Sequence, residues 1–256
     1  MTSRADLVDG ELVLASRIVP ASNATFVAHI GEVAVVYKPI AGERPLWDFP
    51  DGNLAQREVA AYALSEVLGW DIVPRTWLRE GPLGAGMVQL WQEPDPEQEA
   101  VTLVPGDAMP PEGWCHVLDG LDTEDRPVSL IHEDSPALRR MAVFDIIVNN
   151  ADRKGGHVLE MVGGHRHGVD HGLTFHAEHK LRTILWGWLG RDLHADELAG
   201  VERVLAALTG ELGDTLARLL SEAEITALAE RCDLLLQEAR FPAPQGRMPA
   251  VPWPPF

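Results

Sequence analysis

Cysteine and positive charge are both scarce in this sequence. Its 256 residues include only two cysteines, Cys115 and Cys232, which lie far apart in the chain. Two isolated cysteines give no disulfide framework, and such a composition is typical of a reducing compartment. Lys and Arg total 21 against 39 Asp and Glu, which gives a formal net charge of -18 at pH 7. A surface this acidic repels nucleic acids and anionic bilayers, so the composition argues against binding to either.

Long apolar runs are absent as well. No stretch approaches the length that a membrane-spanning helix requires, and no N-terminal apolar run resembles a signal peptide. We therefore expect a cytoplasmic protein without stable membrane association. A chain of 256 residues is long enough for one large domain or for two small lobes that share a cleft.

Residues 1–93 predict a β-rich lobe with a single helix. Strand-like runs lead to a helical stretch that begins after Asn53, a good N-cap, and ends at Gly69. Two further strand-like runs follow, and a Glu-Pro-Asp-Pro stretch beginning at Glu93 marks the end of the lobe. The expected strands are 12–19, 25–30, 33–40, 72–79 and 87–92, and the expected helix is 54–68.

Residues 94–240 predict a second, helical lobe, and residues 241–256 form a proline-rich tail. The region 105–127 is rich in turn-forming residues and predicts loops. Ser135, followed by proline, is a strong helix start. The tail holds six prolines, so we expect it to be extended or disordered. The expected helices of this lobe are 138–148, 196–208, 214–220 and 221–240.

The densest group of polar residues and glycines follows the first helix of the second lobe. It begins at Asn150, includes Asp152, and leads into two short strand-like runs around a Gly-Gly pair, which predict a tight hairpin. The hairpin would bring Asp170 back beside Asp152. Two aspartates at a cleft suit phosphoryl transfer, because one can accept the proton of an attacking hydroxyl while the other holds Mg²⁺ against nucleotide phosphates.

These motifs resemble a known family. The sequence Asn-Ala-Asp-Arg-Lys from Asn150, and the later Val-Asp-His-Gly-Leu-Thr-Phe, are similar to the catalytic and metal-binding loops of the phosphatidylinositol 3-/4-kinase-related superfamily. That superfamily includes the bacterial HipA-type serine/threonine kinases, and the chain resembles an actinobacterial branch of it. The resemblance implies an α+β, bilobal protein-kinase-like fold with a β-rich N-lobe and a helical C-lobe. It also implies that Asp152 and Arg153 are catalytic and that Asp170 binds metal.

The same resemblance implies nucleotide-binding residues in the first lobe. A kinase needs a lysine on its third strand to hold the phosphates and a helix glutamate to hold that lysine, and Lys38 and Glu58 lie at those positions. The turn between the first two strands would cover the phosphates with Ser22 and Asn23, although it lacks glycine. The strand expected to face the adenine supplies Gln89, Leu90 and Trp91.

One position departs from the family pattern. Five residues after its catalytic aspartate, a typical member has an asparagine that binds a second metal ion, whereas this chain has His157. Neutral imidazole is a poor Mg²⁺ ligand because hard cations prefer oxygen. Two outcomes stay open. Either one metal ion held by Asp170 suffices, or the chain is a pseudokinase that binds nucleotide as a regulator without transferring phosphate.

The function that the resemblance implies is an ATP-dependent phosphotransferase, an atypical kinase with ATP and Mg²⁺ as cofactors. The acceptor would be a protein hydroxyl or a small molecule, because the net negative charge fits an anionic lipid headgroup poorly. A basic cluster follows Asp170 in the sequence and either attracts the acceptor or offsets nearby acids. Its candidate substrate-binding residues are His179, Lys180 and Arg182.

The crowding of histidines supports a third hypothesis, a histidine-based metalloprotein. Six of the ten histidines lie between His157 and His179. His165 and His167 alternate on an expected strand, which can place two imidazoles on one face as zinc sites need, and His171 lies nearby. No cysteine and no His-Glu-x-x-His motif accompany them, so hydrogen-bonded or solvated histidines are the competing interpretation.

Overall fold

The structure, a computed structural model, describes residues 4–19, 23–44, 46, 49, 53–106, 108, 111–246 and 248–256. Its helices and strands, in chain order, are α1 (Arg4–Asp9), β1 (Leu12–Arg17), β2 (Phe26–Ile30), β3 (Val33–Pro39), η1 (Ile40–Gly42), α2 (Leu54–Leu68), β4 (Thr76–Gly81), β5 (Gly84–Leu90), β6 (Val101–Pro105), β7 (Trp114–Leu121), β8 (Pro127–Glu133), α3 (Pro136–Val148), η2 (Gly155–His157), β9 (Val158–Glu160), η3 (Val162–Gly164), β10 (Arg166–Gly168), α4 (Ala195–Ala207), α5 (Glu211–Leu216) and α6 (Glu222–Glu238).

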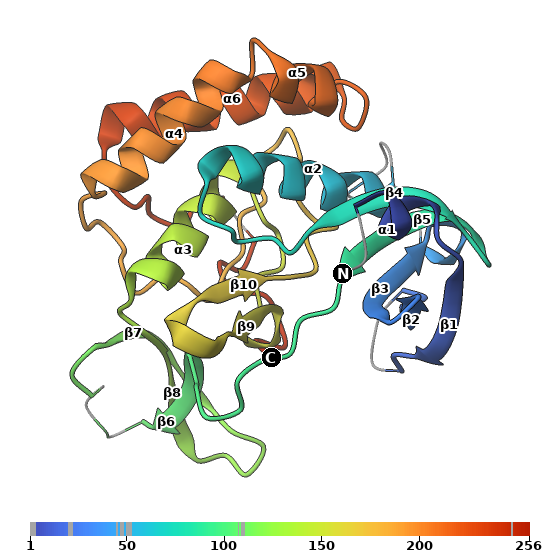
Figure 1. Cartoon of the computed structure of the whole chain (residues 1–256). Coiled ribbons are helices and arrows are strands. Elements are labelled where there is room, and N and C mark those ends of the chain that lie inside the picture. Colours follow the sequence, from blue (N-terminus) through green and yellow to red (C-terminus); the bar gives the residue numbers. More distant parts are fainter. Residues whose placement is uncertain are drawn as a thin grey trace.

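A five-stranded antiparallel sheet forms the N-terminal lobe, with the strand order β1-β2-β3-β5-β4 (Figure 1). Apolar residues alternate along its strands, so that Ala28, Val35 and Tyr37 are each 0% exposed in a small core of their own. Successive side chains of a strand point to opposite faces. Lys38, which lies opposite Met87 of β5, therefore projects from the other face of the sheet, toward α2.

Helix α2 links this sheet to the rest of the molecule. As expected, Asn53 caps it by accepting a hydrogen bond from the N–H of Gln56 at 2.8 Å, and the helix ends at Gly69 in the left-handed conformation (φ 67°). Its apolar side chains, among them Ala61 and Leu64, belong to the large core that α3, α4 and α6 also share. The helix of the first lobe thus shares a hydrophobic core with the second lobe, and a domain boundary at residues 93 and 94 stays a prediction.

The C-terminal lobe packs α4, α5 and α6 above α2 and α3 (Figure 1). Ser135 caps α3 by accepting the N–H of Leu138, and Ser221 and Glu224 form the capping box that opens α6. Trp188, at 0% exposure, is the largest fully buried side chain of the common core. The helix expected at 214–220 begins earlier and is shorter, as α5, and α1 was not expected at all.

The region 105–127, predicted to be loops, instead contributes to a second antiparallel sheet with the strand order β6-β8-β7. The prediction was wrong because turn-forming residues dominate the local composition. They form tight turns between the strands, such as the one in which the N–H of Asp122 donates to the carbonyl of Arg126 at 3.0 Å. The strands gain their stability from pairing with β8, which lies later in the chain, and local composition does not show such pairing.

The described part of the tail packs against the C-terminal lobe, whereas the sequence allowed it to be extended or disordered. Phe241 is 4% exposed and stacks on Trp188 with 5.8 Å between ring centroids. Further on, the carbonyl of Pro255 accepts a hydrogen bond from the N–H of Gly155 at 2.8 Å. The expected disorder is therefore wrong, because apolar side chains and backbone polar groups of the tail find partners on the C-terminal lobe.

The α+β fold class with a β-rich N-lobe and a helical C-lobe is confirmed. The hairpin predicted around the Gly-Gly pair is present as β9 and β10, with Arg166 opposite Glu160, and both glycines have positive φ. Across the described ranges, no helix combines the length and the apolar character that crossing a bilayer requires.

Candidate active site

Arg153 lies at the centre of the segment that follows α3. Its fully buried guanidinium pairs with both carboxylate oxygens of Asp145, with Nε 2.9 Å from Oδ2 and Nη2 2.8 Å from Oδ1. Its Nη1 donates to the carbonyl of His157 at 3.0 Å, and its Nη2 lies 2.8 Å from Nε2 of His171. Arg153 thus holds the surrounding segments in place, and in this conformation its side chain has no exposed surface. Its catalytic role stays a prediction.

Asp145 is a residue of the site that the sequence analysis missed. It stands between Phe144 and Ile146 in the apolar helix α3 and is 0% exposed. A charge buried in an apolar helix is unfavourable unless a partner compensates it. An acid isolated among apolar residues, a few positions before an Arg in a polar loop, was the signal that could have identified the pair.

Two asparagines after α3 shape the loops around the site. Asn149 is left-handed (φ 53°), and its Nδ2 donates to the carbonyls of His176 at 2.8 Å and Glu178 at 2.7 Å. Asn150 accepts the N–H of Asp152 at its Oδ1 over 3.0 Å. Both amides are engaged with the chain itself, so neither replaces the metal ligand that the family pattern has at position 157.

Lys38 joins the two lobes. Its Nζ lies 2.7 Å from Oε1 of Glu58 and 2.8 Å from Oδ1 of Asp170. The other oxygen of Glu58, Oε2, accepts the N–H of His171 at 2.8 Å. Glu58 is 1% exposed, whereas 53% of the Asp170 side chain is accessible to solvent. These three residues, called the Lys38 centre below, come from β3, α2 and the loop after β10.

The charges of the Lys38 centre shift one another's pKa. Burial alone would lower the pKa of Lys38, but the carboxylates of Asp170 and Glu58 outweigh it and raise that pKa. The Lys38 ammonium in turn holds the pKa of Asp170 well below its usual value, against the effect of burial. Burial and the charge of Arg153 hold the pKa of His171 well below its usual range. At neutral pH Lys38 is thus a cation, Asp170 a carboxylate and His171 uncharged.

Asp152 and His157 lie beside this centre. Nδ1 of His157 is 2.9 Å from the carbonyl oxygen of Asp152, and its Nε2 is 3.6 Å from Oδ2 of Asp170. Burial raises the pKa of the Asp152 carboxyl, and the charge of Asp170 adds to this rise, while Lys154 and His157 oppose it. Burial also lowers the pKa of His157. The hairpin therefore brings the two aspartates within electrostatic reach of each other, as expected.

The other first-lobe candidates hydrogen-bond within their own lobe, except Ser22, which lies outside the described residues. Asn23 uses its Oδ1 to accept the N–H of Arg44 at 2.9 Å. The strand expected to face adenine forms its hydrogen bonds within its own lobe. Nε2 of Gln89 donates to Oγ1 of Thr76 at 2.8 Å. The N–H of Leu90 donates to the carbonyl of Arg75 at 3.0 Å, and the N–H of Trp91 to the carbonyl of Ala34 at 3.1 Å. In this conformation neither of these two N–H groups is free to donate to a base.

The three candidate substrate-binding residues have different partners, and their role stays a prediction. Arg182 lies beside Asp152. Its Nε donates to the carbonyl of Ala151 at 2.7 Å, and its charge lowers the pKa of Asp152. The N–H of Lys180 donates to Oδ1 of Asn149 at 2.9 Å. His179 is exposed and lines a separate cavity.

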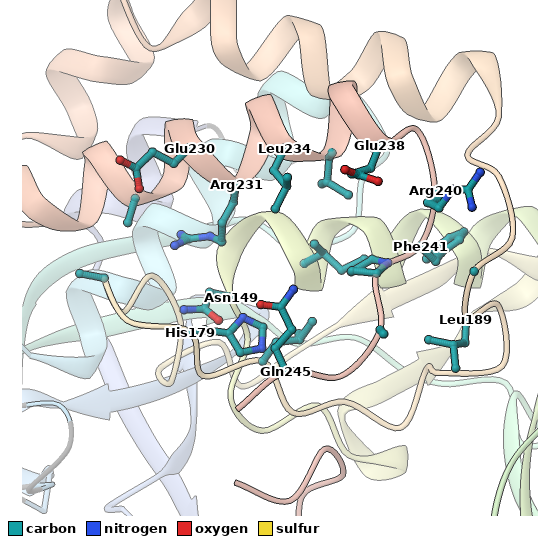
Figure 2. Close-up of a pocket in the computed structure, with 18 residues that line it drawn as sticks. Asn149, His179, Leu189, Glu230, Arg231, Leu234, Glu238, Arg240, Phe241 and Gln245 are labelled. Atoms are coloured by element: carbon teal, nitrogen blue, oxygen red, sulfur yellow. The ribbon is translucent and has the colours of Figure 1, made fainter. Parts of the chain in front are cut away.

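That cavity, about 620 Å³ in volume, lies between α6, the end of α3 and the start of the tail. Figure 2 shows Arg231 and Leu234 projecting from α6 toward Asn149 and His179. Its lining is mainly apolar, and no residue of the Lys38 centre contributes to it. The cavity is therefore distinct from the predicted nucleotide site.

The sequence of the chain is similar to that of a known bacterial protein over its whole length. Protein Rv2133c of Mycobacterium tuberculosis is 47% identical over 273 aligned residues, which cover 100% of this chain and 98% of that protein. The chain belongs to the family of that protein. The match with this relative thus extends over the whole length of both chains. No family model matches the chain.

Among solved structures, the crystal structure of a Helicobacter pylori proinflammatory kinase, CtkA, aligns with 91% of this chain and 94% of its own. The TM-score is 0.48 and the sequence identity 12%. A likeness at this level is too weak to carry a conclusion about this chain. The specific resemblance to phosphatidylinositol 3-/4-kinases and HipA-type kinases stays a prediction.

The first testable prediction concerns the Arg153–Asp145 pair. Arg153→Met should lower the free energy of unfolding by about 3–5 kcal/mol, because it leaves the Asp145 carboxylate buried without a partner. The control is Arg126→Met, which breaks an ion pair with Asp122 whose arginine side chain is 68% exposed. That change should remove less than about 1 kcal/mol. Equal losses in urea unfolding of the two variants would contradict the role of Arg153.

The second prediction concerns the charge of Lys38. Lys38→Met leaves the Glu58 carboxylate buried without its cation and should remove about 1–3 kcal/mol of stability at neutral pH. Because Asp170 has a lowered pKa in the folded protein, its share of this stability is present above the ordinary Asp value of about 4 and declines below it. The difference between variant and wild type should therefore shrink as the pH falls from 6 to 3.

The matched control for Lys38 is Lys154→Met. The two lysine side chains are 20% and 21% exposed, but Nζ of Lys154 lies 3.6 Å from the carboxylate of Asp152, whereas Nζ of Lys38 lies 2.7 Å from that of Glu58. We expect this variant to lose less than about 1 kcal/mol in chemical unfolding. A loss as large as that of Lys38→Met would show that any lysine at this exposure matters equally.

Proposed function

We propose that the chain is an ATP-dependent phosphotransferase that acts on a hydroxyl group of a protein or of a small molecule. The observation that carries this proposal is the Lys38 centre, in which Nζ of Lys38 contacts both Glu58 and Asp170 at 2.7 and 2.8 Å. Kinases require a lysine on the third strand that is paired with a helix glutamate, next to an aspartate that binds Mg²⁺. The order of β3, α2 and the loop after β10 supplies these groups in the same way.

The residues present fit a bound Mg·ATP. Asp170 offers a half-exposed carboxylate with a lowered pKa, which suits a hard cation because it stays ionised. Lys38 would hold the phosphates, and Glu58 would keep Lys38 in place. When bound, Mg²⁺ neutralises phosphate charge and orients the phosphoryl group.

Asp152 would orient the acceptor hydroxyl and accept its proton. Its raised pKa improves its basicity, since a carboxylate that holds a proton more firmly takes one more readily. The nearby Arg182 and Lys154 provide positive charge beside it. Arg153 and Asn150 would fix its backbone, because one holds the loop through Asp145 and the other accepts the N–H of Asp152.

The alternative is a regulator that binds nucleotide without transferring phosphate, and His157 is the observation that favours it. Its imidazole occupies the place where an oxygen ligand for a second metal ion is expected, and its Nε2 lies 3.6 Å from Asp170. Burial keeps this ring neutral by lowering its pKa. Both functions predict nucleotide binding, and turnover separates them.

The third prediction tests both functions at once. Mg·ATP binding is measured by calorimetry, and γ-phosphate transfer or hydrolysis by release of labelled phosphate. Asp152→Asn should reduce turnover about 100- to 10,000-fold with nucleotide affinity retained, because it removes a proton acceptor. Asp170→Asn should weaken Mg²⁺-dependent binding itself. The control is Asp192→Asn, whose side chain is 82% exposed and pairs with Arg240 at 3.6 Å.

The outcomes of this experiment separate the hypotheses. No nucleotide affinity in the wild-type chain would overturn both functions. Affinity without turnover, unchanged in Asp152→Asn, would favour the regulator. Loss of turnover in Asp192→Asn, equal to that in Asp152→Asn, would show that the assay reports general damage.

The fourth prediction concerns His157. Replacing His157 by Asn supplies an amide oxygen, which Mg²⁺ prefers to nitrogen. We expect the Mg²⁺ concentration needed for half-maximal nucleotide binding or turnover to fall in His157→Asn. His116→Asn, at an exposed histidine paired with Asp119, is the control and should change nothing. An unchanged Mg²⁺ requirement in His157→Asn would mean that position 157 takes no part in metal binding.

A further inference from the structure

A second group of metal-ligand side chains lies away from the Lys38 centre. His165 lies just before β10 and His167 lies within it, and residues two apart in an extended segment point to the same side. Asp71 lies in the loop between α2 and β4 and faces them. Among the residues that the structure describes, these are the three side chains of ligand type whose donor atoms all lie within 4.8 Å of one another.

The two imidazole rings point nitrogen atoms toward the same point in space. Nε2 of His165 is 3.3 Å from Nδ1 of His167, and the rings meet edge to face at 84° with 4.4 Å between centroids. Oδ2 of Asp71 lies 3.7 Å from Nε2 of His165. Ligands about 2.0–2.1 Å from a tetrahedral Zn²⁺ ion are about 3.4 Å apart, so these two separations are close to two edges of such a site. The third, between Asp71 and His167, is no more than 4.8 Å.

Backbone contacts hold the group together before any ion binds. The carbonyl of Ile72 accepts the N–H of Gly168 at 2.8 Å. Nε2 of His165 lies 2.9 Å from the carbonyl of Asp71, to which it donates its proton; an ion bound through this nitrogen displaces that proton and replaces the hydrogen bond.

We propose that Asp71, His165 and His167 bind one Zn²⁺ ion, with water in the open coordination position. Two imidazoles and one carboxylate favour zinc over Mg²⁺ or Ca²⁺, which prefer oxygen. The ion links the end of α2, the helix that carries Glu58, to the hairpin that precedes Asp170. The three ligands thus form a zinc clasp, meaning a metal site that cross-links two segments distant in the sequence.

This site corrects the grouping of histidines expected from the sequence. His171 does not take part, because its Nε2 faces the guanidinium of Arg153 at 2.8 Å inside the core. Asp71 takes its place, from a loop almost a hundred positions earlier in the chain. Such a partner is visible only after folding.

The fifth prediction is stoichiometric zinc binding by the full chain after removal of metal with a chelator. Competition against a chromogenic chelator should show one Zn²⁺ per chain that excess Mg²⁺ does not displace. Asp71→Asn, and separately His165→Ala with His167→Ala, should weaken this binding at least about tenfold. In the wild type alone, Zn²⁺ at a hundredfold excess over its Kd should raise Tm by roughly 5–10 °C.

The variants keep the test decisive. Asp71 has a left-handed backbone (φ 52°) that asparagine tolerates well, and its side chain is 73% exposed, so Asp71→Asn should fold normally. Circular dichroism checks this. His116→Ala is the matched histidine control and should bind zinc as the wild type does. Asp170→Asn should also keep the zinc, which separates this site from the proposed Mg²⁺ site.

Three results would overturn the proposal: no zinc bound by the wild type, full affinity in the double histidine variant, or equal loss in His116→Ala. Loss of the zinc in Asp170→Asn with retention in Asp71→Asn would place the ion at the Lys38 centre, and would also overturn it. None of these results depends on phosphotransfer activity.

Discussion

The buried ion pair between Arg153 and Asp145 is the interaction on which the site depends. Both side chains are 0% exposed, and the guanidinium also contacts the carbonyl of His157 and the ring of His171. One cation thereby fixes α3, the loop of Asp152 and the segment of Asp170 relative to one another. A buried charge with several partners tolerates few alternative arrangements, because each alternative leaves a charge or a polar group unpaired.

A second set of charges joins the lobes. Glu58 receives Lys38 on one carboxylate oxygen and the backbone of His171 on the other, so a single buried acid connects β3 to the segment that carries Asp170. The zinc clasp proposed at Asp71 would act on the same helix, α2, from its other end. The N-terminal sheet and the hairpin are thus held by polar contacts at both ends of one helix, whose apolar face belongs to the common core.

Local signals predicted the elements with strong caps and clear periodicity. Helix α2 has the predicted bounds because Asn53 and Gly69 mark its ends, and the hairpin at β9 and β10 follows from its two glycines. The sheet formed by β6, β7 and β8 was missed because its stability comes from strand pairing rather than from composition. Asp145 was missed because its partner lies across a turn, and the burial of Arg153 is not visible in a motif.

The sequence by itself determined the residue types of the site, their order, and the two-lobed α+β class, since caps, periodicity and turn chemistry act over a few residues. Only the tertiary structure decided which of these residues meet. It placed Lys38 between Glu58 and Asp170, buried Arg153, and set Asp71 beside two histidines of the hairpin. These outcomes depend on contacts between distant segments, whose energies come from burial and charge pairing that no local pattern encodes.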